Sequence, residues 1–288
     1  MKKLIDIRRD ADAHWVGNGF PVRTIFSYQT LGQCISPFLM LDYAGPAEFP
    51  PSEKPRGVGE HPHRGFETVT IVYQGELEHR DSAGHHGRIG PGDVQWMTAA
   101  SGVVHEEWHE QAFTRRGGVL EMVQLWVNLP AKHKMSPPRY QEIISGQIPS
   151  VGLDGGATAR VIAGEFQGVE GPARTFTPVT VLDLRLKASV QIEMTFPEGF
   201  TTLVLVLKGE TLMNAAKTAG EAELAIFDRA GEQLIVEATN DATLLVLAGE
   251  PIDEPVVSYG PFVMNTEDEI RQAIHDYRSG RMGHLTAS

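Results

Sequence analysis

The chain has 288 residues and a formal net charge of −12 at pH 7, with 41% hydrophobic and 22% charged residues. This length can enclose a substantial core and favours one large domain or two of ordinary size. The acidic balance disfavours direct contact with nucleic-acid phosphates or anionic lipid and favours a neutral or metal-bound small ligand. The start of the chain is charged too early for a signal peptide, no run reaches membrane-spanning length, and the one cysteine, Cys34, excludes an internal disulfide. We therefore expect a cytoplasmic protein that does not bind membranes.

Short apolar runs separated by glycine and proline dominate the sequence and predict an all-β fold. Alternation of apolar and polar residues indicates strands with one face in a core, and continuous apolar runs indicate strands buried on both faces. Turn-favouring residues gather between positions 145 and 156, so we expect an N-terminal domain over 1–144 and a C-terminal domain over 145–288. The predicted strands include residues 68–73, 94–98, 119–129, 179–186, 190–196, 203–207 and 243–247.

One helix is predicted near the end of the chain. Its start is a Thr-x-x-Glu signal at residues 266–269, and Gly280 marks its end. We expect the helix to pack its apolar face on a barrel and to have no chemical role. The apolar residues at helical spacing are Ile270, Ala273, Ile274 and Tyr277.

An internal repeat relates the two halves. Residues 64–69 and 71–76 resemble residues 198–203 and 205–210 at one constant offset, which predicts two copies of one β-domain. At this offset His61 corresponds to Thr195 and His63 to Pro197, and no histidine occurs between His133 and His275. The second copy therefore cannot build an imidazole-rich metal site.

Two short segments carry metal-binding residue types. A His-Pro-His segment at 61–63 places two imidazoles on the same face of an extended strand, and a His-Glu-Glu segment at 105–107 does the same for an imidazole and a carboxylate. A turn at 90–93 and the strand 94–98 lie between them, so the two pairs can sit on neighbouring strands. Together they predict a site for one divalent transition metal, and imidazole suits zinc, copper, iron and nickel alike. The predicted ligands are His61, His63, His105 and Glu107.

Other residues remain as alternatives to this set. Glu67 would share the face of His63 if the strand continued, so it is an alternative carboxylate ligand or an acceptor for a histidine N–H. A mobile hairpin loop is the simpler account of His79, His85 and His86. His109 has the same parity as His105, but we expect the strand to be leaving the barrel there and do not count it. No nucleophilic triad or phosphate-binding loop is evident, so the chemistry belongs to the metal, with no other cofactor expected.

These segments resemble the pirin family of the cupin superfamily over nearly the whole chain. The strings that carry the resemblance are FLMLD at 38–42, HPHRGFETV at 61–69, PGDVQWMTA at 91–99, QLWVNL at 124–129 and GPFVMNT at 260–266. The resemblance implies a bicupin: two double-stranded β-helix (jelly-roll) barrels, a metal only in the N-terminal one, and chain ends that help complete the opposite barrel. It also implies that His61, His63, His105 and Glu107 bind iron, most readily Fe²⁺, with manganese, cobalt, nickel, copper or zinc as alternatives.

The resemblance further implies a quercetin 2,3-dioxygenase-like oxidoreductase. Such an enzyme uses O2 to open an aromatic flavonol, and Glu107 would serve as both ligand and catalytic base. The alternative is a non-enzymatic regulator in which the oxidation state of the iron changes binding to a partner protein. A metal-dependent isomerase or a sugar-binding cupin is a third, less favoured hypothesis. We expect a monomer, with no nucleic acid or membrane as a direct partner.

Overall fold

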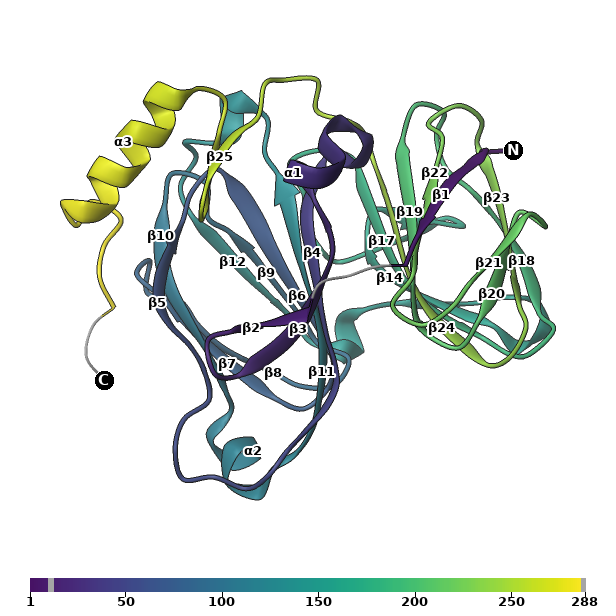
Figure 1. Cartoon of the computed structure of the whole chain (residues 1–288), viewed down its shortest axis with the longest axis horizontal. Coiled ribbons are helices and arrows are strands. Elements are labelled where there is room, and N and C mark those ends of the chain that lie inside the picture. The colour runs from purple at the N-terminus through teal and green to yellow at the C-terminus, as the bar shows by residue number, and fades with distance from the viewer. Residues whose placement is uncertain (10–12, 286–288) are drawn as a thin grey trace. The chain divides into compact units, whose positions relative to one another are not determined.

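The computed structural model describes residues 1–9 and 13–285, and it separates into two compact units that are each built from three chain segments (Figure 1). The N-barrel unit comprises Ala13–Thr24, Leu39–Ser145 and Ile252–Ser288. The C-barrel unit comprises Met1–Asp12, Ile25–Phe38 and Gly146–Pro251. The prediction of an all-β protein with two barrels and a short C-terminal helix is confirmed. No helix within the described ranges is long and apolar enough to cross a membrane.

The N-barrel unit is built on two antiparallel sheets. The seven-stranded sheet has the order β12 (Arg139–Ile143), β9 (Val94–Thr98), β6 (Phe66–Gln74), β11 (Gly118–Asn128), β4 (Phe38–Phe49), β3 (Phe20–Ser27) and β2 (Ala13–Val16). The four-stranded sheet has the order β5 (Gly57–His63), β10 (Val103–His109), β7 (Leu77–Asp81) and β8 (His86–Ile89). A further hairpin pairs β25 (Val257–Tyr259) with β26 (Phe262–Met264).

The C-barrel unit repeats this plan. Its seven-stranded sheet has the order β1 (Leu4–Arg8), β22 (Leu224–Phe227), β19 (Thr201–Lys208), β24 (Ala242–Gly249), β17 (Val179–Leu186), β14 (Thr158–Ala163) and β13 (Ser150–Gly152). Its four-stranded sheet has the order β18 (Gln191–Thr195), β23 (Gln233–Ala238), β20 (Thr211–Met213) and β21 (Lys217–Ala219). A small hairpin pairs β15 (Glu165–Phe166) with β16 (Val169–Glu170). The strand from the start of the chain, β1, thus pairs in the barrel that is built mainly from the second half.

Helical segments are few and short among the described residues. The α-helices are α1 (Tyr28–Leu31), α2 (Gln111–Arg116) and α3 (Glu267–Arg278), and single 3₁₀ turns cover Gly32–Ile35, Ala131–His133, Ser145–Gln147 and Asp154–Gly156. The predicted start of the last helix is confirmed, because Thr266 and Glu269 form a reciprocal capping box. Ile270 and Ala273 are buried against Phe262, whereas Tyr277 remains 39% exposed.

The cross-strand register relates the two repeats residue by residue. Thr195 pairs with Gln233 between β18 and β23, as His61 pairs with His105 between β5 and β10. The interior of the C-barrel unit is filled by a large apolar cluster to which Leu184, Val206 and Leu244 belong. Among the described residues, apolar side chains therefore pack this interior closely.

Candidate metal centre

Three histidines converge on the inner face of the four-stranded sheet of the N-barrel unit. His61 and His63 lie at the end of β5, and the antiparallel register places His105 of β10 directly opposite His61. The metal-binding atoms of the three rings all lie within 4.8 Å of one another, and the centroids of the His61 and His105 rings are 4.2 Å apart. The spacing of two residues in β5 therefore brings both imidazoles to one point, as the sequence predicts.

The free ring nitrogens of these histidines fit a metal ion. His61 Nδ1 lies 2.8 Å from the carbonyl oxygen of Gly59, to which it donates, so in the neutral ring Nε2 is the nitrogen with a free lone pair. His63 Nδ1 and His105 Nε2 are fully buried and have no hydrogen-bond partner among the described residues. A buried nitrogen without a partner costs free energy that coordination of a cation would remove. We conclude that the donor set suits a borderline transition metal.

Burial also keeps these rings in the form that binds metals. Desolvation lowers the pKa of His63 and of His105 well below the ordinary histidine value, and the neighbouring imidazoles act in the same direction. Both rings are therefore neutral at pH 7, and neutral imidazole is the metal ligand.

Glu107 lies beside this cluster, in a second group of possible metal ligands that it forms with His79 and His105. Its carboxylate is within 4.8 Å of the ligand atoms of His79 and His105, and the register between β10 and β5 shifts between His105 and Glu107. The Gln124 amide donates a hydrogen bond of 3.1 Å to Glu107 Oε2, and the Thr70 hydroxyl lies 3.5 Å from Oε1. The structure thus places the carboxylate next to the histidines, and its inclusion in one ligand set with all three remains a prediction.

The reason for considering Glu67 as a ligand is not supported by the backbone. The strand does not continue from His63, because β5 ends there, Gly65 has a positive φ of 90°, and β6 begins at Phe66. Glu67 instead accepts a 2.6 Å hydrogen bond from the Thr98 hydroxyl and belongs to neither candidate metal group among the described residues. Burial raises the pKa of its carboxyl to about 7. The assumption of unbroken alternation was wrong at this turn.

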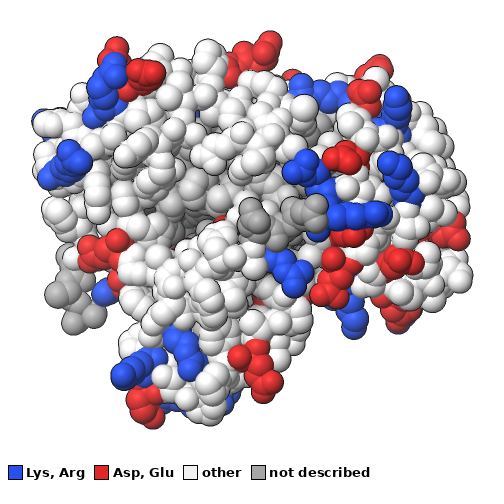
Figure 2. Space-filling view, viewed as in Figure 1, with Lys and Arg blue, Asp and Glu red and all other residues white. Residues whose placement is uncertain are grey.

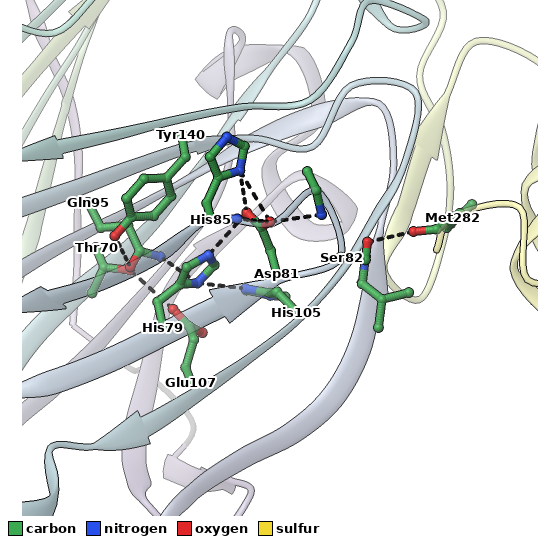
Figure 3. A network of polar contacts seen from close by, with 12 residues as sticks. Thr70, His79, Asp81, Ser82, His85, Gln95, His105, Glu107, Tyr140 and Met282 are labelled. Carbon is green, nitrogen blue, oxygen red and sulfur yellow. Dashed lines mark hydrogen bonds and ion pairs between the residues drawn. The ribbon is translucent and has the colours of Figure 1, made fainter. Parts of the chain in front are cut away.

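The loop interpretation of His79 is also wrong. His79 lies inside β7, is 2% exposed, and pairs in register with Glu107 of β10. Its Nδ1 lies 3.3 Å from Nδ1 of His105, and its Nε2 lies 3.3 Å from Asp81 Oδ2 (Figure 3). In the structure, buried Leu77, His79 and Asp81 alternate with more exposed residues. The sequence interpretation missed this strand because it is short and charged.

The other histidines lie away from the three-histidine cluster. His85 is partly exposed in the turn before β8, and His86 is exposed. His109 is still within β10, donates a 2.8 Å hydrogen bond from Nε2 to the Gly19 carbonyl oxygen, and packs against Phe49. As a carbonyl can only accept, His109 Nε2 must donate. Burial lowers the pKa of His109 to about 4.

Residues distant in sequence hold the turn that follows His63. The buried Lys134 ammonium donates to the carbonyl oxygens of Gly65 (2.7 Å) and Val263 (3.0 Å) and to Asn128 Oδ1 (2.6 Å). The Arg64 guanidinium forms a 2.9 Å ion pair with Asp276 of α3. The helix that we expected only to cover the barrel therefore also anchors the residue next to a candidate ligand.

Aromatic side chains border the cluster. The ring of His63 lies 5.1 Å from that of Phe66 and 5.3 Å from that of Trp126, centroid to centroid. His61, Gln124 and Trp126 are each partly exposed, whereas His63 and His105 are buried. Solvent therefore reaches the cluster from the side of the partly exposed residues.

Acidic and basic residues are interspersed on the face of the molecule that Figure 2 shows. On the face shown in Figure 2, Lys and Arg side chains alternate with Asp and Glu, and no basic patch gathers there. This arrangement agrees with the overall charge of −12.

Comparison with known proteins relates the whole chain to one family. The family model described as Pirin matches residues 19–127, and the model of the Pirin C-terminal cupin domain matches residues 181–283. A Pseudomonas aeruginosa protein named "putative quercetin 2,3-dioxygenase" is 59% identical over 282 residues, 98% of each chain. A pirin-like protein of Solanum lycopersicum is 41% identical over 93% of this chain and 88% of its own. The crystal structure of a quercetin 2,3-dioxygenase from Acinetobacter baumannii matches with a TM-score of 0.96 at 49% identity, covering 99% of this chain and 100% of that one.

Proposed function

Because this chain belongs to the pirin family, we propose that its N-barrel unit binds one divalent transition metal, iron(II) in the first instance, and catalyses oxidative ring opening of a flavonol. The proposed ligands are His61, His63, His105 and Glu107. The observation that carries the proposal is the pair of fully buried, unpartnered nitrogens, His63 Nδ1 and His105 Nε2, among the described residues. Relatives and a solved structure that bear the name quercetin 2,3-dioxygenase supply the substrate class.

A metal held by these four residues would act as a Lewis acid and as a template for the substrate. Glu107 would take the proton of the flavonol 3-hydroxyl group, and Gln124, which donates a hydrogen bond to Oε2, supports this role by holding the carboxylate. Loss of this proton makes the ring electron-rich. The overall reaction adds O2 to the flavonol and releases carbon monoxide and the opened ester product.

The aromatic border of the cluster fits a planar substrate. The rings of Phe66 and Trp126 contact each other with their centroids 4.3 Å apart and their planes tilted by 33°, and of the two only Trp126 is partly exposed. Aromatic side chains of this kind favour flat rings through offset or edge contacts. Trp126 is therefore the aromatic side chain beside His63 that a planar substrate would contact.

The test combines metal analysis with an aerobic assay. The purified chain is stripped, reloaded separately with iron, manganese, cobalt, nickel, copper or zinc, and supplied with quercetin while carbon monoxide release is followed. We expect one metal per chain and turnover with at least one metal, and we expect Glu107→Gln to abolish turnover. An exposed-site variant, His86→Gln, serves as the matched control with unchanged activity.

The outcomes separate the two functional hypotheses. Metal binding without turnover of quercetin by any loaded form would remove the dioxygenase proposal. The regulator hypothesis would then be examined by comparing partner binding of the ferrous and ferric protein, and equal affinities would eliminate it.

A further inference from the structure

A chain of buried polar contacts extends from His105 away from the three-histidine cluster. Figure 3 shows His105, His79, Asp81 and His85 joined in that order. The two Nδ1 atoms of His105 and His79 are 3.3 Å apart, His79 Nε2 is 3.3 Å from Asp81 Oδ2, and His85 Nδ1 is 3.0 Å from the same oxygen. His105 and His79 are no more than 2% exposed, and the Asp81 side chain is 1% exposed.

The partners of His79 decide where its proton lies. The amide nitrogen of Gln95 lies 3.3 Å from His79 Nδ1, and an amide nitrogen can only donate. His79 Nδ1 is therefore the acceptor of the ring, and the proton sits on Nε2, where it faces the Asp81 carboxylate.

The same reasoning extends to His105. Since His79 Nδ1 accepts, a hydrogen bond between the two Nδ1 atoms requires a proton on His105 Nδ1, and His105 and Gln95 then share the one lone pair of His79 Nδ1. A neutral His105 then has Nε2 as its lone-pair nitrogen. This atom is the one that has no hydrogen-bond partner among the described residues, so the contacts behind the ring present the correct nitrogen to a metal.

We infer that His79 and Asp81 are positioning residues, which fix the tautomer and the orientation of His105 as a metal ligand. The inference rests on the proposed metal centre and adds residues that the ligand set does not contain. Hydrogen-bond acceptors behind a ligating histidine orient the ring and increase its basicity. Here the acceptor next to the proposed ligand His105 is the imidazole of His79, and the carboxylate of Asp81 contacts His79 rather than His105.

Surrounding contacts hold both positioning residues in place. Asp81 Oδ1 accepts hydrogen bonds from the backbone amides of Ala83 (2.9 Å) and His85 (3.0 Å), which leaves Oδ2 directed at His79. The Tyr140 ring stacks on His79 with centroids 4.9 Å apart and an interplanar angle of 16°. A Cβ on Gly87 would lie 1.9 Å from the Tyr140 hydroxyl, so a glycine is needed there for this stacking.

Paired substitutions distinguish hydrogen bonding from packing. In His79→Gln, the side-chain carbonyl can accept from His105 and the side-chain NH2 group can donate to Asp81. The hydrogen-bonded path from His105 through His79 to Asp81, here called the relay, therefore survives. In His79→Phe, stacking on Tyr140 survives but both hydrogen bonds are lost. We expect metal affinity to fall 10–100-fold in His79→Phe and to change much less in His79→Gln. If His79 acted through packing alone, the order of the two variants would be reversed, which would overturn the inference.

A second measurement observes the tautomers directly. In the zinc-loaded protein, nitrogen-15 NMR of the histidine rings should show protons on His105 Nδ1 and His79 Nε2. Asp81→Asn can present an amide donor to His79 and should shift the His79 proton to Nδ1, with weaker zinc binding. A His79 proton on Nδ1 in the unmodified protein would refute the relay.

The controls separate failure of the relay from failure of the metal centre. His86→Phe and His86→Gln repeat the same substitutions at an exposed position of β8 and should bind metal as the unmodified chain does. No metal in the unmodified chain would refute the metal centre itself. Normal binding there, with equal affinity in His79→Phe, would refute only the relay, and two metals per chain would show that His79 is itself a ligand.

Discussion

Lys134→Met tests how the turn after His63 is held. The side chain of Lys134 is 1% exposed, and each of its three ammonium hydrogens has an acceptor at 2.6–3.0 Å. Methionine keeps most of the volume but leaves two backbone carbonyls and the Asn128 amide oxygen without this donor. An unsatisfied buried polar group costs about 1–3 kcal/mol, so we expect a loss of about 3 kcal/mol in the free energy of unfolding at pH 7.

The loss should depend on pH in a defined direction. Burial lowers the pKa of Lys134 from 10.5 to about 7, so between these values the unfolded chain binds one more proton than the folded chain. Stability rises with pH where the unfolded state binds more protons. From pH 7 to pH 9 the unmodified chain should therefore gain about 2 kcal/mol relative to Lys134→Met, which cannot titrate there.

The assay is urea unfolding of both proteins at pH 7 and pH 9, followed by tryptophan fluorescence. Comparison of the two proteins cancels the titration of groups that they share, provided that their environments are unchanged. A stability difference between the two proteins that stays constant or shrinks as the pH rises would falsify the lowered pKa of Lys134.

Three further predictions concern the site and its support. His61→Ala should lose the metal, whereas Glu67→Gln should keep it. Glu67 accepts a hydrogen bond from Thr98 and belongs to neither candidate metal group among the described residues. Elemental analysis of the two purified variants tests this prediction. Glu107→Gln should bind metal about 10-fold or more weakly and show no quercetin turnover, and retention of full turnover would contradict its role as base. Asp276→Asn leaves the buried Arg64 guanidinium without its ion-pair partner and should destabilise the chain by about 3 kcal/mol in chemical unfolding. An unchanged midpoint would contradict a stabilising role for this ion pair.

Local sequence patterns were sufficient to predict the strands, the C-terminal helix and the internal repeat. Alternation and glycine punctuation predicted strands that the structure contains, and the Thr266–Glu269 signal predicted the capping box of α3. Both are short-range effects, since side-chain parity and helix capping depend on residues only a few positions apart. The repeat also predicted that the second barrel lacks the histidine pair, and Thr195 does occupy the place of His61.

The errors at Glu67 and His79 share one cause. The alternation of side-chain direction can be extrapolated along the chain only while the strand continues. The positive φ of Gly65 interrupts the strand between His63 and Glu67. For His79, the deciding fact was its cross-strand neighbour Glu107, which comes from pairing between β7 and β10. Neither the break nor the pairing can be read from hydrophobic periodicity.

The sequence by itself predicted that His61, His63 and His105 would converge, since His-x-His in an extended segment presents two imidazoles on one face, and the structure brings these three rings together. Only the tertiary structure decided which nitrogen of each ring is free. Gly59 and Asp81 are neighbours of His61 and His79 in the same strands, but Gln95 reaches His79 from another strand, and Lys134 and Asp276 hold the turn beside the ligands from distant parts of the chain. The contacts made by Gln95, Lys134 and Asp276 follow from the tertiary fold rather than from local spacing.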